Sequence, residues 1–238
     1  MEYIKEFRKT YSNSGLEYKK KTFSRIGIVY KILPKKILLF IEKKMKEHDF
    51  LVQKDLWEEF KGCERVLDVG CGSGRFLMAA PKGLICLGIE INPHEAIKCK
   101  KGGLKVKVGN IENINLKKNS LDGILMSHVI EHLNNPIKIL DKLKKSLKKD
   151  GKIVIITPNF SVCYKEFYND PTHKKPFTKQ SLFRILYDIG FKEIKIKNYS
   201  RHTNLLTSFL VFFPRLRIKI EKILEKFHSP YMIAIARK

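Results

Sequence analysis

Apolar and polar positions divide the chain into a helical first part and an alternating second part. From Glu2 to about Phe60, apolar residues recur every three or four positions with Pro34 as the strong break, which predicts amphipathic helices. From Arg65 onward, short β-branched runs alternate with segments of helical or turn character, as buried parallel strands joined by helices do. The expected strands are RVLDV, LICLGIE, LKVKV, LDGILMS, GKIVIIT, FKEIKIKNYS and PYMIAIARK.

The segments between these strands complete the prediction of a doubly wound α/β fold. We expect a mostly parallel, seven-stranded, Rossmann-like sheet with a helical N-terminal extension and a helical insertion before the last strand. Helices are predicted over residues 75–80, 93–101, 136–149 and 179–189, the last of them ended by a glycine. The proline-rich stretch 158–178 is predicted to be an irregular loop arched over the sheet.

The insertion covers about residues 202–228 and contains an apolar stretch followed by a helix with several basic residues. One face of this helix is formed by Leu216, Ile220, Ile223, Leu224 and Phe227. Three interpretations are open: a helical pair packed on the sheet, a lid that closes over an apolar acceptor, or an interfacial element that lies on anionic lipid.

Charge widens the range of partners. The formal net charge is +24, from 48 Lys and Arg against 24 Asp and Glu, so the long-range field attracts anions. Phosphorylated metabolites, nucleotide sugars, RNA and anionic membranes all fit this field. Because the lysines are dispersed along the whole chain, a surplus that serves no partner fits as well.

The cysteines and the first residues of the sequence indicate the cellular compartment of the protein. The five cysteines are odd in number and form no C-x-x-C pair, which argues against a disulfide framework and a zinc site. The charged and aromatic start is unlike a signal peptide, and no apolar run reaches membrane-spanning length. We therefore expect a cytoplasmic protein, with any membrane contact peripheral and made through residues 202–228.

The strongest local signal is VLDVGCGSGRF, Val66 to Phe76, in which a strand runs into a glycine-rich turn that opens a helix. Gly70 and Gly72 allow close backbone approach, and the helix start offers N–H groups to a nucleotide-like ligand. The spacing departs from the G-x-G-x-x-G of dinucleotide folds, which weakens a nicotinamide interpretation. Glu90 ends the second strand, where its carboxylate suits the ribose hydroxyls of any adenosine cofactor.

Five segments in order make the pattern more specific: VLDVGCGSGRF, GIE, VGNIENI, LDGILMSHVIEHL and LKKDGKIVIITPN. Together they resemble the motifs of class I S-adenosylmethionine-dependent methyltransferases over roughly Arg65 to Asn159. The later DPTHKKPFTKQSLFRILYDIGFKEI resembles the small-molecule branch, which includes quinone-biosynthesis and glycan-associated enzymes. The resemblance implies a methyltransferase domain over 61–238 behind a helical cap over 1–60, with S-adenosylmethionine as cofactor and S-adenosylhomocysteine as product.

The resemblance also implies which residues bind this cofactor. Asp68 and the glycine loop would hold the methionine part, Glu90 the ribose, and Asn110, where many relatives have Asp, the adenine. The full set of implied cofactor-binding residues is Asp68, Gly70, Cys71, Gly72, Glu90, Ile91, Asn110, Ile111 and Ser127.

Methyl transfer itself needs alignment more than acid–base chemistry, because the sulfonium methyl is already an activated electrophile. Holding the reactants in line contributes on the order of 7–11 kcal/mol, and a positioned base adds roughly 10²–10⁴-fold where the acceptor loses a proton. His128 and His173 are the candidate catalytic residues, the alternative being hydrogen-bonded loop histidines. His132 would share a helical face with His128, but we expect no metal. The small-RNA end-modifying methyltransferases, which have such a cluster, also have an upstream acid that Ser127 and His128 replace here.

The function predicted from these observations is methylation, by direct in-line transfer, of a small-molecule or lipid- or glycan-linked acceptor, on oxygen before nitrogen or carbon. The acceptor pocket is expected between the N-terminal helices and the DPTH loop. The alternatives are an RNA methyltransferase, an NAD-dependent oxidoreductase, and a fold that binds cofactor without catalysis.

Overall fold

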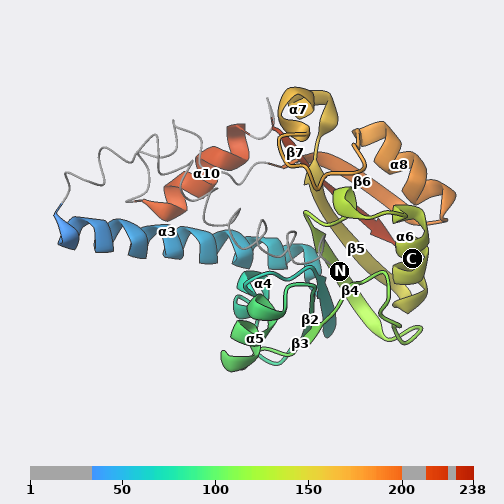
Figure 1. The fold of residues 1–238 in the computed structure, drawn as a ribbon, viewed down its shortest axis with the longest axis horizontal. Coiled ribbons are helices and arrows are strands. Elements are labelled where there is room, and N and C mark those ends of the chain that lie inside the picture. Colours follow the sequence, from blue (N-terminus) through green and yellow to red (C-terminus); the bar gives the residue numbers. More distant parts are fainter. Residues whose placement is uncertain (1–33, 200–212, 225–228) are drawn as a thin grey trace.

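The computed structural model describes residues 34–199, 213–224 and 229–238. One seven-stranded sheet has the order β3-β2-β1-β4-β5-β7-β6, and β7 runs antiparallel to the other six strands (Figure 1). The predicted doubly wound, mostly parallel, Rossmann-like sheet is therefore confirmed. The strands are β1 Arg65–Val69, β2 Ile85–Glu90, β3 Val106–Val108, β4 Leu121–Ser127, β5 Leu147–Pro158, β6 Lys192–Tyr199 and β7 Tyr231–Arg237.

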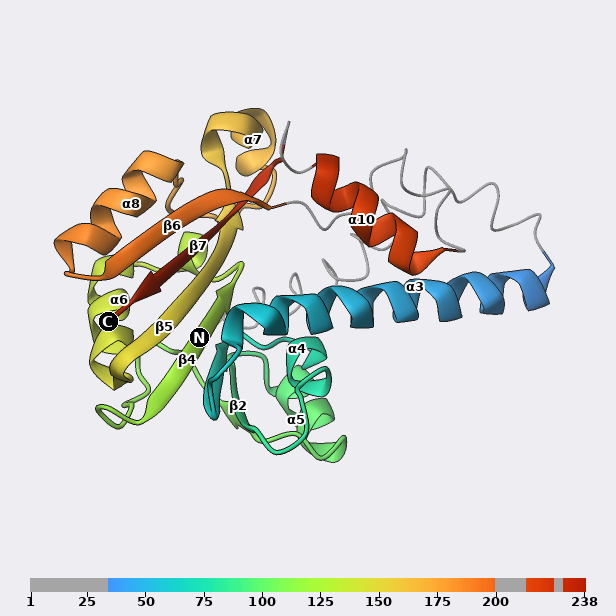
Figure 2. The same ribbon diagram turned by 180° about the vertical axis from the view of Figure 1, so that it is seen from behind.

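Helices cover both faces of the sheet. One core layer contains residues of α4, α5 and the end of α3, and the other contains residues of α6 and α8 (Figure 2). None of the helices within the described ranges is long and apolar enough to cross a membrane. The helical elements are α3 Lys35–Leu56, η1 Trp57–Phe60, α4 Arg75–Met78, α5 Pro93–Lys101, η2 Ile130–His132, α6 Pro136–Ser146, α7 Phe160–Phe167, α8 Lys179–Asp188 and α10 Pro214–Leu224.

The end of α3 and η1 fix the helix that follows the glycine loop. The Trp57 ring stacks on Phe76 with centroids 4.2 Å apart, and Trp57 Nε1 donates to the Phe76 carbonyl at 2.9 Å. Phe60 packs against the sheet at Gly123, where a Cβ would lie only 2.6 Å from the Phe60 ring. This packing joins the N-terminal helix to the start of the sheet.

Two predicted boundaries were wrong. The helix predicted over 136–149 ends at Ser146, because Leu147 is fully buried and pairs with Leu121 as the first residue of β5. The short helix predicted over 75–80 ends at Met78.

The stretch predicted as an irregular loop contains α7. Its first turn is closed by the Asn159 carbonyl, which accepts from the backbone N–H groups of Val162 and Cys163. Phe160 and Phe167 meet edge to face at 5.3 Å and join the two ends of the helix. Only the remainder of 158–178, after α7, is irregular.

The predicted helix of the insertion is present as α10, but its apolar face does not cover the core. Leu216 and Ile223 are exposed, whereas Arg217 is 1% exposed. The packing of α10 is mainly against α3 and not against the sheet. The predictions that concern residues 2–33, the rest of the insertion, and the Leu224 and Phe227 side chains lie outside the described residues.

Candidate functional site

The glycine loop that follows β1 is held against the end of β2. The backbone N–H groups of Gly70 and Cys71 both donate to the Ile89 carbonyl, at 2.8 and 3.0 Å. Gly70 has φ +74°, and a Cβ there would lie 2.4 Å from Val129 Cγ2. Both its dihedral angle and its surroundings therefore require glycine at this position.

Glu90 closes the loop from the end of β2. Its Oε2 accepts from the Gly72 backbone N–H at 2.7 Å, its Oε1 accepts from the Asn92 N–H at 2.8 Å, and only 7% of the residue is exposed. A carboxylate has about four acceptor positions, so lone pairs remain for ligand hydroxyls. Gly72 has φ +53°, and the space that a Cβ would enter there is open. The loop therefore leaves room beside Glu90 for a ligand.

Asp68 adds a second buried carboxyl group to this pocket. It is 3% exposed, and burial together with the negative charge of Glu90 raises its pKa to about 7. Two carboxylates in one buried site favour a ligand that brings positive charge. The amino and sulfonium groups of S-adenosylmethionine meet this requirement.

The residues expected at the adenine differ in exposure. The Ile91 side chain is 51% exposed directly after β2, where an apolar surface is available for stacking. Asn110 is half-buried, and its Oδ1 accepts from the Glu112 backbone N–H at 2.9 Å. The Ile111 side chain is 4% exposed and packs into the core, so it stabilises the loop that contains Asn110.

The predicted catalytic end of the site begins where β4 stops. Ser127 is the last residue of β4, and His128 follows with φ +53°, which is unusual for a residue with a side chain. The His128 backbone N–H donates to the Ile156 carbonyl of β5 at 2.8 Å. Backbone strain of this kind occurs often at functional sites.

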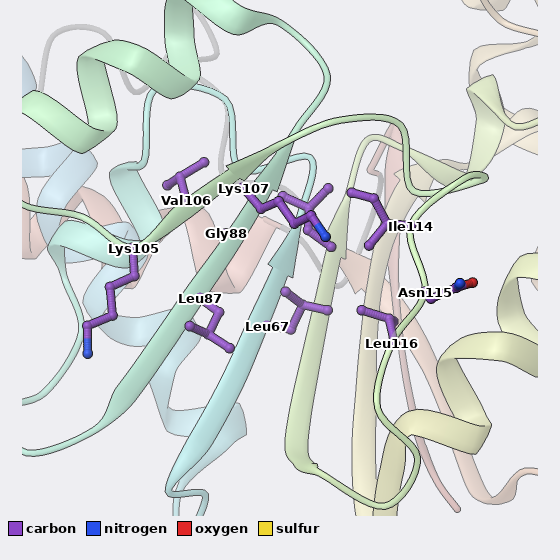
Figure 3. A pocket seen from close by; sticks show the side chains of 10 residues that line it. Leu67, Leu87, Gly88, Lys105, Val106, Lys107, Ile114, Asn115 and Leu116 are labelled. Atoms are coloured by element: carbon purple, nitrogen blue, oxygen red, sulfur yellow. The ribbon is translucent and has the colours of Figure 1, made fainter.

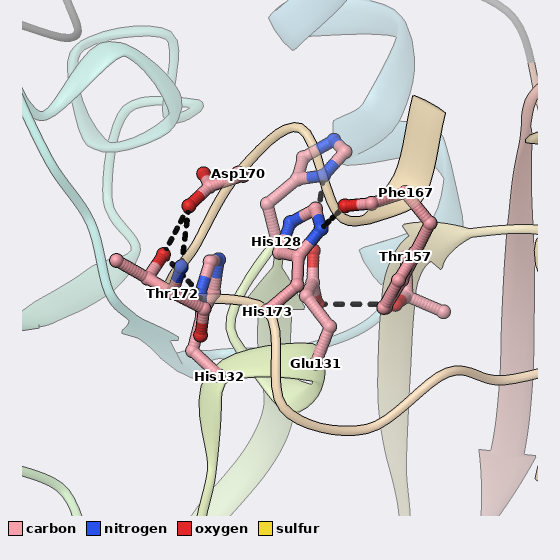
Figure 4. A network of polar contacts seen from close by, with 8 residues as sticks. All are labelled: His128, Glu131, His132, Thr157, Phe167, Asp170, Thr172 and His173. Carbon is pink, nitrogen blue, oxygen red and sulfur yellow. Dashed lines mark hydrogen bonds and ion pairs between the residues drawn. The ribbon is translucent and has the colours of Figure 1, made fainter. Parts of the chain in front are cut away.

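Glu131 lies beneath His128 and has no exposed surface (Figure 4). Its Oε1 is 3.3 Å from His128 Nδ1, and its Oε2 accepts from Thr157 Oγ1 at 3.0 Å. Burial alone would raise the pKa of Glu131, but the hydrogen bond and charge of His128 and the charge of His132 hold it below its ordinary value. An ionised Glu131 carboxylate therefore lies within ion-pair distance of His128 Nδ1.

The DPTH loop is anchored to the same residue. The backbone N–H groups of Lys174 and Lys175 donate to the Glu131 carbonyl at 2.8 and 3.0 Å. His173 Nδ1 lies 2.6 Å from the Phe167 carbonyl, and its ring is 4.8 Å from that of His132. The structure thus brings both predicted catalytic histidines to the carboxyl end of β4.

Three of these side chains can together hold a metal ion. Glu131, His132 and His173 place one ligand atom each within 4.8 Å of one another, a different set from the His128 and His132 pair noted in the sequence. Thr157 and His128 already engage the Glu131 oxygens, and Thr172 engages His132 Nδ1. The expectation that no metal is used stays a prediction.

A hollow of about 360 Å³ lies on the sheet face at the level of the middle of β1 and β2 (Figure 3). The chain between β3 and β4 crosses this face without a helix, which leaves the hollow uncovered. None of the predicted cofactor-binding or catalytic residues lines it. Its walls are Leu67, Leu87, Gly88, Ile89, Lys105, Val106, Lys107, Ile114, Asn115 and Leu116.

Sequence reasoning missed three residues of the site. Glu131 was noted only as a neighbour of two histidines, although its position in SHVIEHL was visible. Thr157 and Tyr231 come from β5 and β7, and the Tyr231 ring lies 5.0 Å from His128. No local pattern marks these two, because the antiparallel pairing of β7 with β5 brings Tyr231 to the site.

Comparisons with known proteins identify the family of this chain. A family model described as a methyltransferase domain matches residues 35–196. A solved structure of a SAM-dependent methyltransferase from Archaeoglobus fulgidus is 31% identical, with a TM-score of 0.63. It covers 85% of this chain and 99% of its own.

Curated relatives share shorter stretches. An uncharacterized protein of Methanocaldococcus jannaschii is 32% identical over 138 residues, or 55% of this chain. The ubiquinone/menaquinone biosynthesis C-methyltransferase of Citrifermentans bemidjiense is 29% identical over 162 residues, or 62% of this chain. Each match spans 66% of the relative's own length.

Proposed function

This chain belongs to the methyltransferase-domain family and is an S-adenosylmethionine-dependent methyltransferase, and from that premise we propose that it methylates oxygen on a small-molecule or lipid- or glycan-linked acceptor. The observation that carries the choice of oxygen is the buried Glu131 carboxylate, 3.3 Å from His128 Nδ1. A carboxylate-oriented imidazole is suited to remove a proton, and a hydroxyl acceptor has one to lose. The curated relatives do not fix the acceptor, since one of them is named a C-methyltransferase.

The cofactor-binding part of the proposal assigns the glycine loop and the end of β2 to the cofactor. Asp68 and the loop residues Gly70, Cys71 and Gly72 face the methionine part, and Glu90 accepts from the ribose hydroxyls. On the adenine side, Ile91 provides an exposed apolar surface. Asn110 and the backbone of Ile111 lie at the neighbouring strand end, and Ser127 lies on the side of the methyl group.

In the proposed reaction, His128 accepts the acceptor proton while an oxygen–carbon bond forms and the carbon–sulfur bond breaks. The cofactor supplies a methyl group already activated by a positively charged sulfur. Glu131 is a positioning residue, since it acts through His128 and Thr157. His173 is a second candidate for contact with the acceptor, held by Phe167 on the anchored loop.

Labelled S-adenosylmethionine incubated with fractionated cell extract tests the acceptor class directly. The proposal predicts label in a small-molecule, lipid or glycan fraction, in a bond that has the stability of an ether or ester. Label in RNA would instead support the RNA methyltransferase, which the net charge of +24 keeps as the alternative. Label in protein, or on carbon or nitrogen, would contradict the choice of oxygen.

Variants of the histidine test its role once an acceptor is known. We expect His128→Gln to lower kcat by roughly 10²–10⁴-fold while the affinity for S-adenosylhomocysteine stays unchanged. Glu131→Gln should lower kcat less, since the imidazole remains. A His128→Gln protein that keeps the wild-type kcat and binds S-adenosylhomocysteine normally would exclude His128 as the base.

A further inference from the structure

The helix α10 presents its apolar side chains to solvent. Phe213, immediately before the helix, is 63% exposed, Leu216 is 48% exposed and Ile223 is 57% exposed. Ile220 is half-buried between the last two. Spacings of three and four residues place all four side chains on one face of the helix. The described part of the chain leaves this face largely uncovered.

The buried side of α10 contains a charged residue next to this apolar face. Arg217 is 1% exposed and lies where α10 packs against α3. A helix that only covers a core buries its apolar face and exposes its charges. Here Arg217 is buried whereas Leu216 and Ile223 are exposed, so burial in the protein core does not account for these two apolar side chains.

The neighbouring helix α3 continues the same kind of surface. Leu39 and Phe50 are 57% and 50% exposed, and their spacing of about three turns puts them on one line of the helix. That line faces away from Val52 and Leu56, which are buried. The exposed lysines around it are Lys35, Lys36, Lys43, Lys46 and Lys54.

The two helices form an arm beside the sheet. Figures 1 and 2 show α3 as a long rod that extends beyond the sheet, with α10 alongside it. In chain order α10 is followed by β7, whose first residue, Tyr231, contacts His128. The arm is therefore close in sequence to a residue at the catalytic end of the site.

We propose that this arm, α3 with Phe213 and α10, binds the surface of an anionic lipid membrane. Interfacial helices of this kind bury an apolar face at the level of the lipid headgroups and keep cations at its margins. On α10 the exposed Arg215 and Lys219 flank the apolar face, and the net charge of +24 supplies long-range attraction. RNA is the less fitting partner, because aliphatic side chains at the centre of the face neither pair with phosphates nor stack on bases. The inference holds whatever the acceptor is.

Co-sedimentation with vesicles of phosphatidylcholine, with and without phosphatidylglycerol, tests the proposal. We expect binding to the anionic vesicles that falls as salt is raised, and little binding to pure phosphatidylcholine. Any protein with this charge adsorbs to some extent on anionic vesicles, so the apolar contribution has to be measured separately. The double variant Leu216→Ser with Ile223→Ser should weaken binding by roughly tenfold or more without changing the charge.

The matched control is Phe183→Ser with Tyr187→Ser on α8, at the end of the molecule away from α10 (Figures 1 and 2). These residues are 45% and 61% exposed, and their replacement also leaves the charge unchanged. The control should bind vesicles like the wild type. Equal loss in both variants, or no loss in the α10 variant, would overturn the proposal. So would synthetic RNA that binds the wild type and the α8 control equally but binds the α10 variant at least tenfold more weakly.

Titration with S-adenosylhomocysteine separates this inference from the proposed function. The α10 variant should keep the wild-type affinity for this product, which shows that the domain is folded. Loss of vesicle binding with intact product binding supports the arm. If the wild type binds vesicles but does not bind S-adenosylhomocysteine, the proposed cofactor site is wrong and the proposed membrane binding by the arm is still supported.

Discussion

Among single residues, Asp68 is expected to make cofactor binding dependent on pH. Its pKa is about 7 because of burial and the nearby Glu90 charge, so near pH 6 most of the protein has a neutral Asp68. A cationic ligand favours the ionised carboxylate, and binding therefore has to displace the proton at low pH. We expect the affinity for S-adenosylmethionine to rise between pH 6 and pH 8, measured by calorimetry in buffers of matched ionic strength.

The variant Asp68→Asn is the control for this prediction. It keeps the size of the side chain and removes the titrating group, so its affinity should be weaker and nearly constant over the same range. A wild-type affinity that does not change between pH 6 and pH 8 would show that Asp68 does not face the positive charge of the ligand.

Replacement of Gly70 in the glycine loop introduces both backbone strain and a steric contact. Gly70→Ala forces φ +74° on a residue with a side chain, at about 1–2 kcal/mol, and drives the new methyl group into Val129. The midpoint of thermal unfolding and the affinity for S-adenosylhomocysteine should both fall. Adding Val129→Ala should restore part of each, because it removes the contact but not the strain.

Gly83→Ala provides the comparison for Gly70. Gly83 has φ +88° with no atom within 4 Å of a new Cβ, so alanine there brings strain alone and leaves product binding unchanged. If the two alanine variants lose the same stability and the same affinity, the contact with Val129 has no part in shaping the loop.

At the scale of elements, the cap of α8 holds the end of the DPTH loop. Thr178 Oγ1 accepts from the Ser181 backbone N–H at 3.1 Å, and Ser181 Oγ accepts from the Thr178 N–H at 2.9 Å. Thr178→Ala should lower the free energy of unfolding by about 1 kcal/mol in urea. Ser161→Ala, at an exposed position in α7, should change it by less than about 0.5 kcal/mol. A Thr178→Ala protein as stable as Ser161→Ala would show that the cap is not needed.

Treatment with a chelator distinguishes two roles for the cluster of Glu131, His132 and His173: binding of a metal ion, or support of His128 as the base. We expect methyl transfer and thermal stability to be unchanged after dialysis against EDTA, because Glu131 already binds His128 and Thr157. A loss that zinc, manganese or magnesium restores would establish a metal site there and replace the acid–base role proposed for His128.

Helices, strands and turns were predictable where residues close together in the sequence determine where they begin and end. The turn after β1, the proline start of α5 and the glycine after α8 were visible in the sequence, and these elements lie where they were expected. The end of α6 was not predictable from local signals, because it is determined by the pairing of Leu147 with Leu121 in the sheet. In α7, prolines and aromatic residues predicted a loop, yet Phe160 and Phe167 pack across one helix.

At the scale of the whole molecule, the chain path assembles the site from distant segments. The arrangement of the proposed cofactor half was predictable, because β1, the glycine loop and β2 are consecutive and Glu90 ends the second strand. The catalytic half was only partly predictable: Glu131 meets Thr157 and Lys174 through tertiary contacts that no local pattern encodes. For α10, helical periodicity was visible, but the side that faces solvent depends on its packing against α3.

Calorimetric titration with S-adenosylhomocysteine tests the cofactor site most directly, using the wild type, Glu90→Gln and Glu95→Gln as the control acid on the neighbouring α5. The wild type should bind in the micromolar range and give no heat with NADH. Glu90→Gln should bind roughly tenfold or more weakly because it loses charge-assisted hydrogen bonds to the ribose, while Glu95→Gln should match the wild type. Equal affinities for all three proteins, or no binding by the wild type, would contradict the assignment of this pocket.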